Sequence, residues 1–295
     1  MRITKVRCQL LTASTNLSAL GATLANWTTA LAIIETDTGL TGIGECYAGL
    51  FAPDAVAALV EQFSPLLVGE DPRRVTYLHD KLYAKSLFWA KAGLPLAVAG
   101  TIENALWDLK GQALGVPVYE LLGGRAHDRI KVYASGGLQD DIEATVDEMK
   151  GYVAQGYKAV KIRIWNDYDS DVRKLQAARE ALGDDVEMMV DAVMGHNPRP
   201  WSAKEALRRA AVLEELNVRW YEEPCGNRDY AGYAFVRDHT SVPVAGGESA
   251  VGLHEFTPFF DAGSLDIAQP DPAHSGGIIE VQRIAAMARA KGVQV

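Results

Sequence analysis

The feature that most constrains the fold is a regular alternation of strand-like and helix-like segments, which runs from about Asp128 to the last residue, Val295. Short apolar runs such as VEMMVDA and VPVAGGE predict strands, and amphipathic runs such as SAKEALRRAAVLEELN predict helices between them. Short connections between such units are typical of a parallel sheet covered by helices. Six units and the start of a further strand, VQV, favour a (β/α) barrel over an open doubly wound sheet.

Two further observations refine this prediction. No glycine-rich dinucleotide-binding fingerprint follows any of the strands, which counts against a Rossmann fold. A full eight-unit barrel takes roughly 250 residues, more than the chain provides after Asp128. We therefore expect a (β/α)7-8 TIM-like barrel over 126–295 that is incomplete at the C-terminus and truncated in strand 7. Either the native chain continues past Val295, or another element fills the gap.

The first part of the chain, 1–125, lacks this alternation. The runs RITKVRCQLL, WTTALAIIETD and LTGIGECYA predict a β-meander. Helical patterns follow, and the third, LAVAGTIENALWDLKGQALG, places Gly115 as a C-cap. Strands followed by helices predict a separate α+β domain.

Composition limits the classes of function. The formal net charge of −9 argues against non-specific nucleic-acid binding, which requires a basic face. The 3 cysteines are scattered and suggest neither a zinc site nor a disulfide framework. The N-terminus lacks the apolar core of a signal peptide, and no apolar run approaches the roughly 18 residues of a membrane span. We expect a cytoplasmic protein with no nucleic-acid or membrane partner.

Three acidic residues, Asp191, Glu222 and Glu248, each close one of the strand-like runs. They are spaced by about one strand–helix unit, roughly 30 residues. Because parallel strands place their C-terminal ends at one edge of the sheet, the three carboxylates are expected to converge. Converging carboxylates require a cation, and hard oxygen ligands suit Mg²⁺. The neighbouring Glu223 is expected to point away from them, because side chains alternate along a strand.

Two cations and a further acid complete the candidate site. Lys161 and Arg163 lie on the same side of the strand VKIRI, and Asp271 ends the sixth strand. Removing a proton next to a carboxylate creates an enediolate, whose charge a divalent cation and a lysine stabilise. A positioned base takes the proton. The residues therefore predict a metal-dependent enzyme that acts on a small carboxylate.

In this order, the segments resemble the mandelate racemase/muconate-lactonizing enzyme family of the enolase superfamily, across essentially the whole chain. The resemblance is carried by ENALWDLKGQALGVPVYELLGG, GYKAVKIRI, MMVDA, WYEEP, GGES and QPDPAHSGG. It implies that the first domain is a capping domain and that Mg²⁺ is bound by Asp191, Glu222 and Glu248. It also implies that the Thr12–Asn26 stretch and the loop near Glu45–Gly49 close over the substrate. Homo-oligomers are common in the family, so we expect one here.

Three positions distinguish members of this family. Asp271 is typical of the mandelate racemase-like subgroup, in which it partners a histidine base that here would follow Val295. The second cation of the Lys-x-Lys strand is Arg163, a poor base that is better suited to binding a carboxylate. Val193 occupies a position where an asparagine or histidine is common, and the nearby His196 could substitute. These features favour a one-base dehydratase of a sugar acid.

Alternatives remain open from the sequence. A racemase or epimerase of a hydroxy acid shares the first step, and a non-catalytic relative or inactive fragment is a third hypothesis. Asp271 can also be read as a turn residue before a proline. Tyr47 either lines the substrate pocket or packs between the domains, and His196 is a candidate substrate-binding residue. The substrate itself cannot be identified, because substrate-binding loops vary freely on a common fold.

Overall fold

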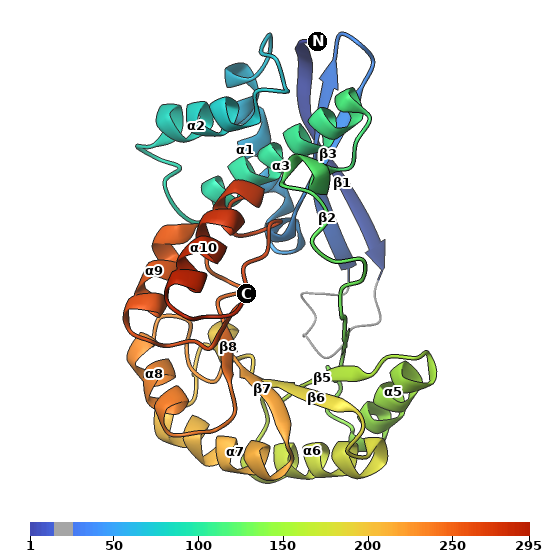
Figure 1. The fold of residues 1–295 in the computed structure, drawn as a ribbon, viewed down its shortest axis with the longest axis vertical. Coiled ribbons are helices and arrows are strands. Elements are labelled where there is room, and N and C mark those ends of the chain that lie inside the picture. The colour runs from blue at the N-terminus through green and yellow to red at the C-terminus, as the bar shows by residue number, and fades with distance from the viewer. Residues whose placement is uncertain (15–25) are drawn as a thin grey trace.

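The computed structural model describes residues 1–14 and 26–295. The chain forms a cap, drawn at the top of Figure 1, and a barrel domain beneath it. The predicted order of a meander, a group of helices and a parallel α/β array is confirmed. The part of the Thr12–Asn26 stretch over 15–25 lies outside the described residues, and its two ends belong to strands.

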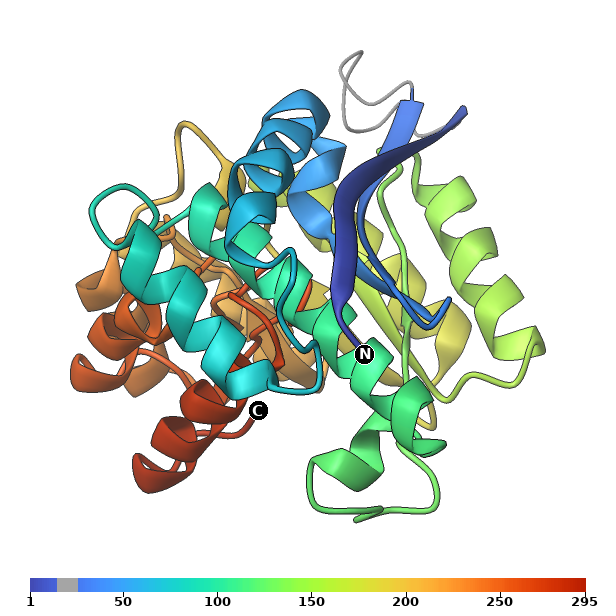
Figure 2. The same ribbon diagram turned by 90° about the horizontal axis from the view of Figure 1, so that it is seen from above.

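The cap is a three-stranded antiparallel sheet covered by helices. Its strands are β1 (Ile3–Ser14), β2 (Asn26–Thr36) and β3 (Thr41–Cys46), in that order. Its helices are α1 (Pro53–Phe63), α2 (Val75–Ser86), α3 (Leu94–Leu114) and α4 (Val118–Leu121). Seen from above, α3 runs across the middle of the cap, between α2 and the strands (Figure 2). The helix is buried along most of its length, which makes it the central element of the cap's apolar core.

Helix α3 and strand β3 approach each other closely. A Cβ atom at Gly44 would lie 2.0 Å from the carbonyl oxygen of Thr101, and the Ile43 amide donates to Asp108 Oδ2 at 2.9 Å. The predicted end of α3 is confirmed, because Gly115 adopts the left-handed conformation with φ 68° and caps the helix.

The barrel domain is a six-stranded parallel sheet with helices on its outer side. The strands, in spatial and sequence order, are β4 (Ala134–Ser135), β5 (Ala159–Arg163), β6 (Glu187–Asp191), β7 (Val218–Glu222), β8 (Val244–Gly246) and β9 (Ile267–Ala268). The helices are α5 (Ile142–Ala154), α6 (Tyr168–Leu182), α7 (Ala203–Glu215), α8 (Tyr230–Asp238), α9 (Leu253–Asp261) and α10 (Ile278–Ala290). The helices form an arc around the strands (Figure 1). The core lies between the two layers.

The two ends of the sheet differ from expectation in length. The run RIKVYASGG forms only the short strand Ala134–Ser135. The strand expected at VQV is present as a parallel bridge between Gln294 and Ile267 of β9, in which the Ala268 amide donates to the Gln294 carbonyl oxygen at 2.8 Å. Every pairing from β4 to this bridge is parallel, with one register shift between β6 and β7, so the strands' C-terminal ends lie along one edge.

The cap is joined to the barrel where α3 meets the turn after β9. A Cβ atom at Gly100 would lie 2.1 Å from the backbone carbonyl carbon of Gly276, so only glycine permits this approach. Asn104 Nδ2 donates to the Pro272 carbonyl oxygen at 2.8 Å, and its Oδ1 accepts from the Ile278 amide. The buried Glu103 accepts from the Ile279 amide at 3.0 Å. Helix α3 of the cap domain therefore supplies the hydrogen-bond acceptors for the first two backbone amides of α10.

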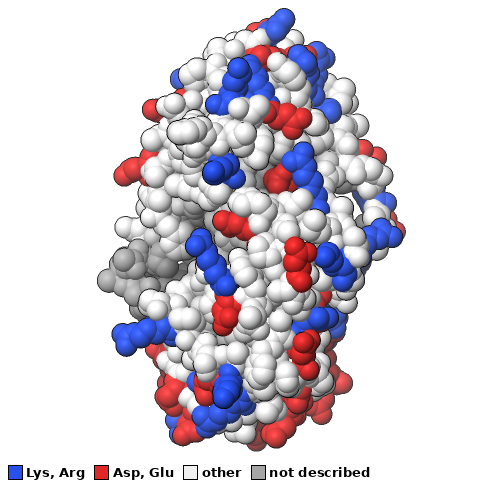
Figure 3. Space-filling model, turned by 90° about the vertical axis from the view of Figure 1, so that its left-hand side faces the viewer, with Lys and Arg blue, Asp and Glu red and all other residues white. Residues whose placement is uncertain are grey.

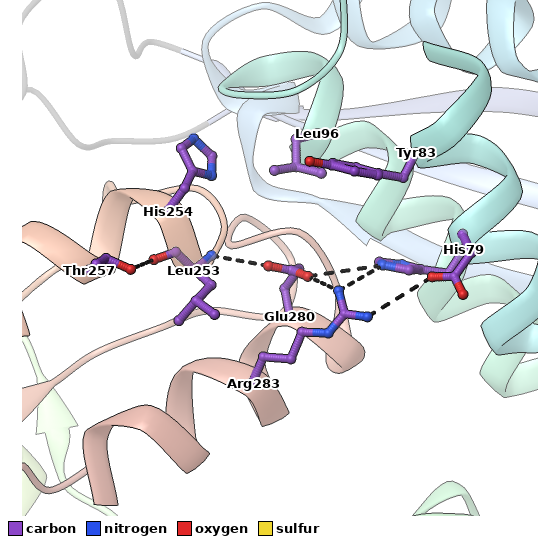
Figure 4. Close-up of a pocket in the computed structure, with 9 residues that line it drawn as sticks. His79, Tyr83, Leu96, Leu253, His254, Thr257, Glu280 and Arg283 are labelled. Atoms are coloured by element: carbon purple, nitrogen blue, oxygen red, sulfur yellow. Dashed lines mark hydrogen bonds and ion pairs between the residues drawn. The ribbon is translucent and has the colours of Figure 1, made fainter. Parts of the chain in front are cut away.

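Beside this junction, charged side chains from α2 and α10 face each other across a pocket (Figure 4). His79 Nδ1 lies 3.1 Å from Glu103 Oε2, and Arg283 Nη1 donates to Glu280 Oε1 at 2.5 Å. The second Glu280 oxygen accepts from the Leu253 amide at the start of α9. Across the pocket, His79 Nε2 lies 3.4 Å from Arg283 Nη1 and 4.0 Å from Glu280 Oε1, and these contacts tie α2 of the cap to α10 of the barrel domain.

The surface carries both signs of charge. On the face shown in Figure 3, Lys and Arg are interspersed with Asp and Glu, and the acidic residues gather toward the barrel end. Within 1–14 and 26–295, no helix combines the length and the apolar character that a membrane crossing requires.

Candidate active site

Four charged side chains from three neighbouring strands form the buried centre of the candidate site. They are Lys161 and Arg163 on β5, Asp191 at the end of β6 and Glu222 at the end of β7. Lys161 Nζ lies 2.5 Å from Glu222 Oε1 and 3.3 Å from Asp191 Oδ2. Arg163 Nε lies 3.4 Å from the same Asp191 oxygen. The structure thus brings together four of the residues that the sequence predicts at the strand ends.

Burial and neighbouring charges shift the pKa values in this centre. Burial, together with repulsion from Glu222, raises the pKa of Asp191 to about 6. Burial opposes the positive charge of Lys161, but the Glu222 and Asp191 carboxylates outweigh it and raise the pKa of the ammonium group. Lys161 is therefore a protonated hydrogen-bond donor in this arrangement.

Glu222 has a partner for each carboxylate oxygen. Oε1 accepts from Lys161, and Oε2 accepts from Trp220 Nε1 at 3.1 Å. Trp220 lies two residues earlier on the same strand, so alternation places both side chains on one side of the sheet. The Trp220 ring meets Tyr133 edge-on, with 5.3 Å between ring centroids. These contacts fix the orientation of the Glu222 carboxylate.

Arg163 is held by the loop that follows β4. Its Nη1 donates to the Gly136 carbonyl oxygen at 3.0 Å, and Glu148 on α5 accepts from the adjacent Gly137 amide at 3.0 Å. The guanidinium is partly exposed, with 23% of the side-chain surface accessible. It therefore combines a fixed position with a free edge, which suits the binding of a carboxylate.

A second group of side chains lies beside this centre and consists of His196, Glu223 and Glu248. His196 Nε2 lies 2.8 Å from Glu248 Oε1 and 3.6 Å from Glu223 Oε2. The hydrogen bond with Glu248 raises the pKa of His196 to about 9 and lowers the pKa of Glu248. Burial and repulsion from Glu248 raise the pKa of Glu223 to about 8.

The expectation that Glu223 points away from the site is wrong. Strand β7 ends at Glu222, so strand alternation no longer applies to the next residue. Glu223 has a left-handed backbone with φ 45°, which turns its side chain toward His196. Such a conformation in a residue other than glycine costs of order 1–3 kcal/mol and is concentrated at functional sites.

The loop after β6 is shaped to receive the Glu223 carboxylate. Val193 also has a left-handed backbone, with φ 56°, and the Met194 amide donates to the Glu223 carbonyl oxygen at 3.1 Å. A Cβ atom at Gly195 would lie 2.4 Å from each Glu223 carboxylate oxygen. A glycine at 195 is therefore required for Glu223 to occupy this position.

Asp271 and Tyr47 lie where the cap meets the barrel. Asp271 Oδ1 accepts from the Ala273 amide at 2.7 Å, so its side chain makes the turn contact that the sequence left open. The Tyr47 amide donates to the Ala273 carbonyl oxygen at 3.0 Å, and the Tyr47 ring meets His274 edge-on. Burial raises the pKa of the Tyr47 phenol, which also senses the charge of Glu248. The loop near Glu45–Gly49 therefore contacts the barrel rim beside the site.

The predicted donor set has the chemistry of a divalent-cation site, but its three carboxylates do not form one cluster in the structure. Asp191 and Glu222 contact Lys161, whereas Glu248 contacts His196. The Asp191, Glu222 and Glu248 oxygens are hard ligands of the kind that Mg²⁺ prefers. Asp191 Oδ1 is oriented by the Val193 amide at 2.9 Å. Burial is the main cause of the raised pKa of Asp191, and repulsion from Glu222 adds to it; a bound cation would oppose both effects.

The sequence did not identify Glu223, Trp220 and Tyr133 as parts of this site. The signal for Trp220 was present, because residues two apart on a strand share a side. For Glu223, the signal is the pair of acids at a strand end followed by Pro224, where regular pairing stops.

Comparisons with known proteins agree with this architecture. Residues 5–123 match the family model "Mandelate racemase / muconate lactonizing enzyme, N-terminal domain", and residues 144–295 match "Enolase C-terminal domain-like". The chain is 39% identical over 273 residues to a D-galactonate dehydratase of Variovorax paradoxus, covering 88% of this chain and 68% of that protein.

Two further proteins are similar. The chain is 35% identical over 266 residues to a D-galactarolactone cycloisomerase of Agrobacterium fabrum, covering 89% of this chain and 68% of that protein. Its fold matches the crystal structure of a racemase from Streptomyces coelicolor A3(2) with bound magnesium, with a TM-score of 0.88 and 28% identity, covering 99% of this chain and 82% of that one.

Proposed function

The chain belongs to the mandelate racemase/muconate lactonizing enzyme family of the enolase superfamily, and from this premise we propose that it is a Mg²⁺-dependent lyase acting on a sugar acid. The reaction begins with removal of the proton next to the carboxylate. The β-hydroxyl group then leaves as water, which gives an enol that becomes a 2-keto acid. The observation that carries this proposal is the buried meeting of Lys161, Asp191 and Glu222 at the strand ends.

The names of the relatives support the substrate class. A D-galactonate dehydratase and an arabinonate dehydratase are 39% and 35% identical to this chain, and both names denote the dehydration of a sugar acid. We therefore propose a polyhydroxylated carboxylate as the substrate.

We propose that Asp191, Glu222 and Glu248 hold the Mg²⁺ ion. When bound, the ion supplies Lewis-acid stabilisation of the charge that develops on the substrate carboxylate. The match to a racemase structure with bound magnesium supports this assignment. So does the chemistry of the three carboxylates, two of which, Asp191 and Glu222, are almost fully buried.

The cationic side chains take two roles. Lys161 holds a proton on Nζ at the centre of the site and donates hydrogen bonds to acceptors around it. Arg163 stays protonated, and its free edge binds substrate oxygen atoms. We propose that Asp271 orients a histidine base, and that Tyr47 and His196 contact the substrate from the cap side and from the loop after β6.

The proposal is tested by incubating the purified protein and Mg²⁺ with a panel of sugar acids that includes D-galactonate and arabinonate. Mass spectrometry of the products is the readout. A product lighter than its substrate by one water molecule, which reacts as a 2-keto acid, is the expected result. Lys161→Met and chelator-treated protein are the controls, and neither is expected to form the product.

A second candidate function, isomerisation, is supported by the 35% identity to a D-galactarolactone cycloisomerase. Racemisation or epimerisation also conserves the mass of the substrate. Incubation in deuterated water separates these outcomes. Incorporation of deuterium without loss of water supports an isomerase, and no exchange on any acid of the panel would support the non-catalytic alternative.

A further inference from the structure

The trio His196, Glu223 and Glu248 has the geometry of a cation site of its own. One ligand atom from each residue can be chosen so that all three lie within 4.8 Å of one another. The distances from His196 Nε2 to the two carboxylate oxygens are 2.8 and 3.6 Å. Donor atoms that share one ion at about 2.0–2.2 Å lie about 3–3.5 Å apart. The three side chains therefore need little movement to bind one cation.

The Glu223 carboxylate is independent evidence that this position suits a positively charged ligand. Glu223 is 1% exposed, and its Oε2 atom accepts no hydrogen bond from any of the described residues. A buried carboxylate oxygen without a hydrogen bond is costly, because it has lost its hydration. This oxygen is the one that faces His196.

The local backbone is arranged to keep Glu223 there. Both Val193 and Glu223 have left-handed backbones, and Gly195 leaves space that a side chain would fill. Strain of this kind persists where the surrounding structure requires a particular side-chain position. Here the strained backbone keeps the buried Glu223 carboxylate directed at the His196 imidazole.

The charge balance separates this trio from the buried centre. Asp191 and Glu222 are paired with Lys161 and Arg163. Over 1–14 and 26–295, Glu223 and Glu248 form ion pairs with His196 and with no lysine or arginine.

We propose that His196, Glu223 and Glu248 bind a second divalent cation, next to the Mg²⁺ site proposed above. The imidazole nitrogen selects an ion that accepts nitrogen ligands, such as Mn²⁺ or Zn²⁺, over Mg²⁺. Glu248 belongs to both ligand sets and would bridge the two positions, as carboxylates do in two-metal sites. This inference rests on the proposed function, because that function supplies the first cation.

The test is a metal-binding measurement on the purified chain, independent of activity. The protein is stripped with a chelator, saturated with Mg²⁺ and dialysed against increasing Mn²⁺, and bound metal is counted by elemental analysis. We expect two divalent ions per chain, and electron paramagnetic resonance is expected to show coupled Mn²⁺ pairs when Mn²⁺ alone is supplied.

Two variants and one control locate the second ion. His196→Gln and Glu223→Gln are each expected to reduce the count from two ions to one and to abolish the coupled signal. His254→Gln, an exposed histidine outside the trio, is expected to keep both ions. Circular dichroism confirms that each variant is folded.

The outcomes distinguish this inference from the proposed function. A count of one ion in the wild type that is unchanged in His196→Gln overturns the second site and leaves the lyase proposal standing. In that case His196 is simply the protonated counter-ion of two carboxylates. A count of zero overturns both proposals.

Discussion

At the scale of single residues, Lys161 determines the charge balance of the candidate site. It is 4% exposed and lies between two buried carboxylates. Its position followed from the sequence, because the strand VKIRI and the acids at the ends of the next two strands share one edge of a parallel sheet. We therefore expect the loss of this charge to lower the catalytic rate while the rest of the chain keeps its fold.

We predict that Lys161→Met lowers kcat by roughly 10²–10³-fold, the range for loss of one positioned donor that stabilises developing negative charge. Steady-state kinetics on the best sugar acid of the panel checks this. The matched control is Lys158→Met, an exposed lysine that lies just before the same strand, whose kcat should stay within twofold, or about 0.4 kcal/mol. Equal activity of the two variants would remove Lys161 from the mechanism.

A second residue-scale prediction concerns stability. Arg209 Nη1 donates to Asp171 Oδ2 at 2.5 Å, and both residues are buried between α6 and α7. Asp171→Asn removes the buried carboxylate and leaves the partly exposed Glu205 as the remaining acidic partner of the guanidinium, which should lower the free energy of unfolding by up to about 3–5 kcal/mol. Urea denaturation measures the change. Asp169→Asn, an exposed acid on the same helix, should change it by less than about 0.5 kcal/mol.

The position of Glu223 could not be predicted from the sequence, whereas the positions of Asp191 and Glu222 could. Asp191 and Glu222 follow from strand ends, since alternation and a shared edge are regular properties. Glu223 depends on a left-handed backbone one residue past the strand and on the space above Gly195. Neither is visible in a hydrophobic pattern, because both arise from how two loops meet.

At the scale of elements, the helices were easier to predict than the strands. The runs that became α3 and α7 carry apolar periodicity and end signals. Gly115 ends α3 as expected, and Ser202 caps α7 by accepting from the Glu205 amide. The short strands β4 and β9 contain two residues each. Their limits depend on pairing with neighbours, which a local pattern does not contain.

The contact between α3 and the turn after β9 gives an element-scale prediction. In Gly100→Ala, the new Cβ would lie 2.1 Å from Gly276, so the cap and the barrel must separate locally. We expect a loss of about 1–3 kcal/mol in the free energy of unfolding. Thermal denaturation followed by circular dichroism is the measurement.

The matched control is Gly151→Ala in α5, where a Cβ would meet no atom within 4 Å. Alanine favours a helix over glycine by up to about 1 kcal/mol, so this variant should be as stable as the wild type or more so. If Gly100→Ala behaves like Gly151→Ala, the close approach of α3 to the barrel is not a constraint.

At the scale of the whole molecule, the order of a cap and a parallel α/β array could be predicted, because strands followed by helices give way to a regular alternation of strands and helices along the chain. Each part has its own apolar cluster, with Phe63 and Leu106 in the cap and Tyr221 and Phe256 in the barrel domain. The boundary between 125 and 126, the homo-oligomer and the cytoplasmic location stay predictions.

The proposed metal site leads to a whole-molecule prediction. A cation that binds only the folded chain stabilises it by about 2.7 kcal/mol at 100 times its Kd. For a chain of this size, that corresponds to a rise in Tm of roughly 4–5 °C. Differential scanning calorimetry with Mg²⁺ and then with a chelator measures the shift.

Glu248→Gln serves as the control, because it removes a proposed ligand that is half-buried at the edge of the site. Its Tm should respond much less to Mg²⁺ than that of the wild type. An identical Mg²⁺ response in both proteins would show that the stabilising ion binds elsewhere.

The junction between α3 and α10 has a consequence for biosynthesis. Asn104 and Glu103 find their partners Ile278 and Ile279 at 174 and 176 residues further along the chain. Because a ribosome adds roughly 5–20 residues per second, those partners are synthesised roughly 10–35 s after Glu103 and Asn104. During that interval the side of α3 that carries Leu96 and Gly100 has no barrel to pack against, so we expect it to be accessible to solvent and to chaperones.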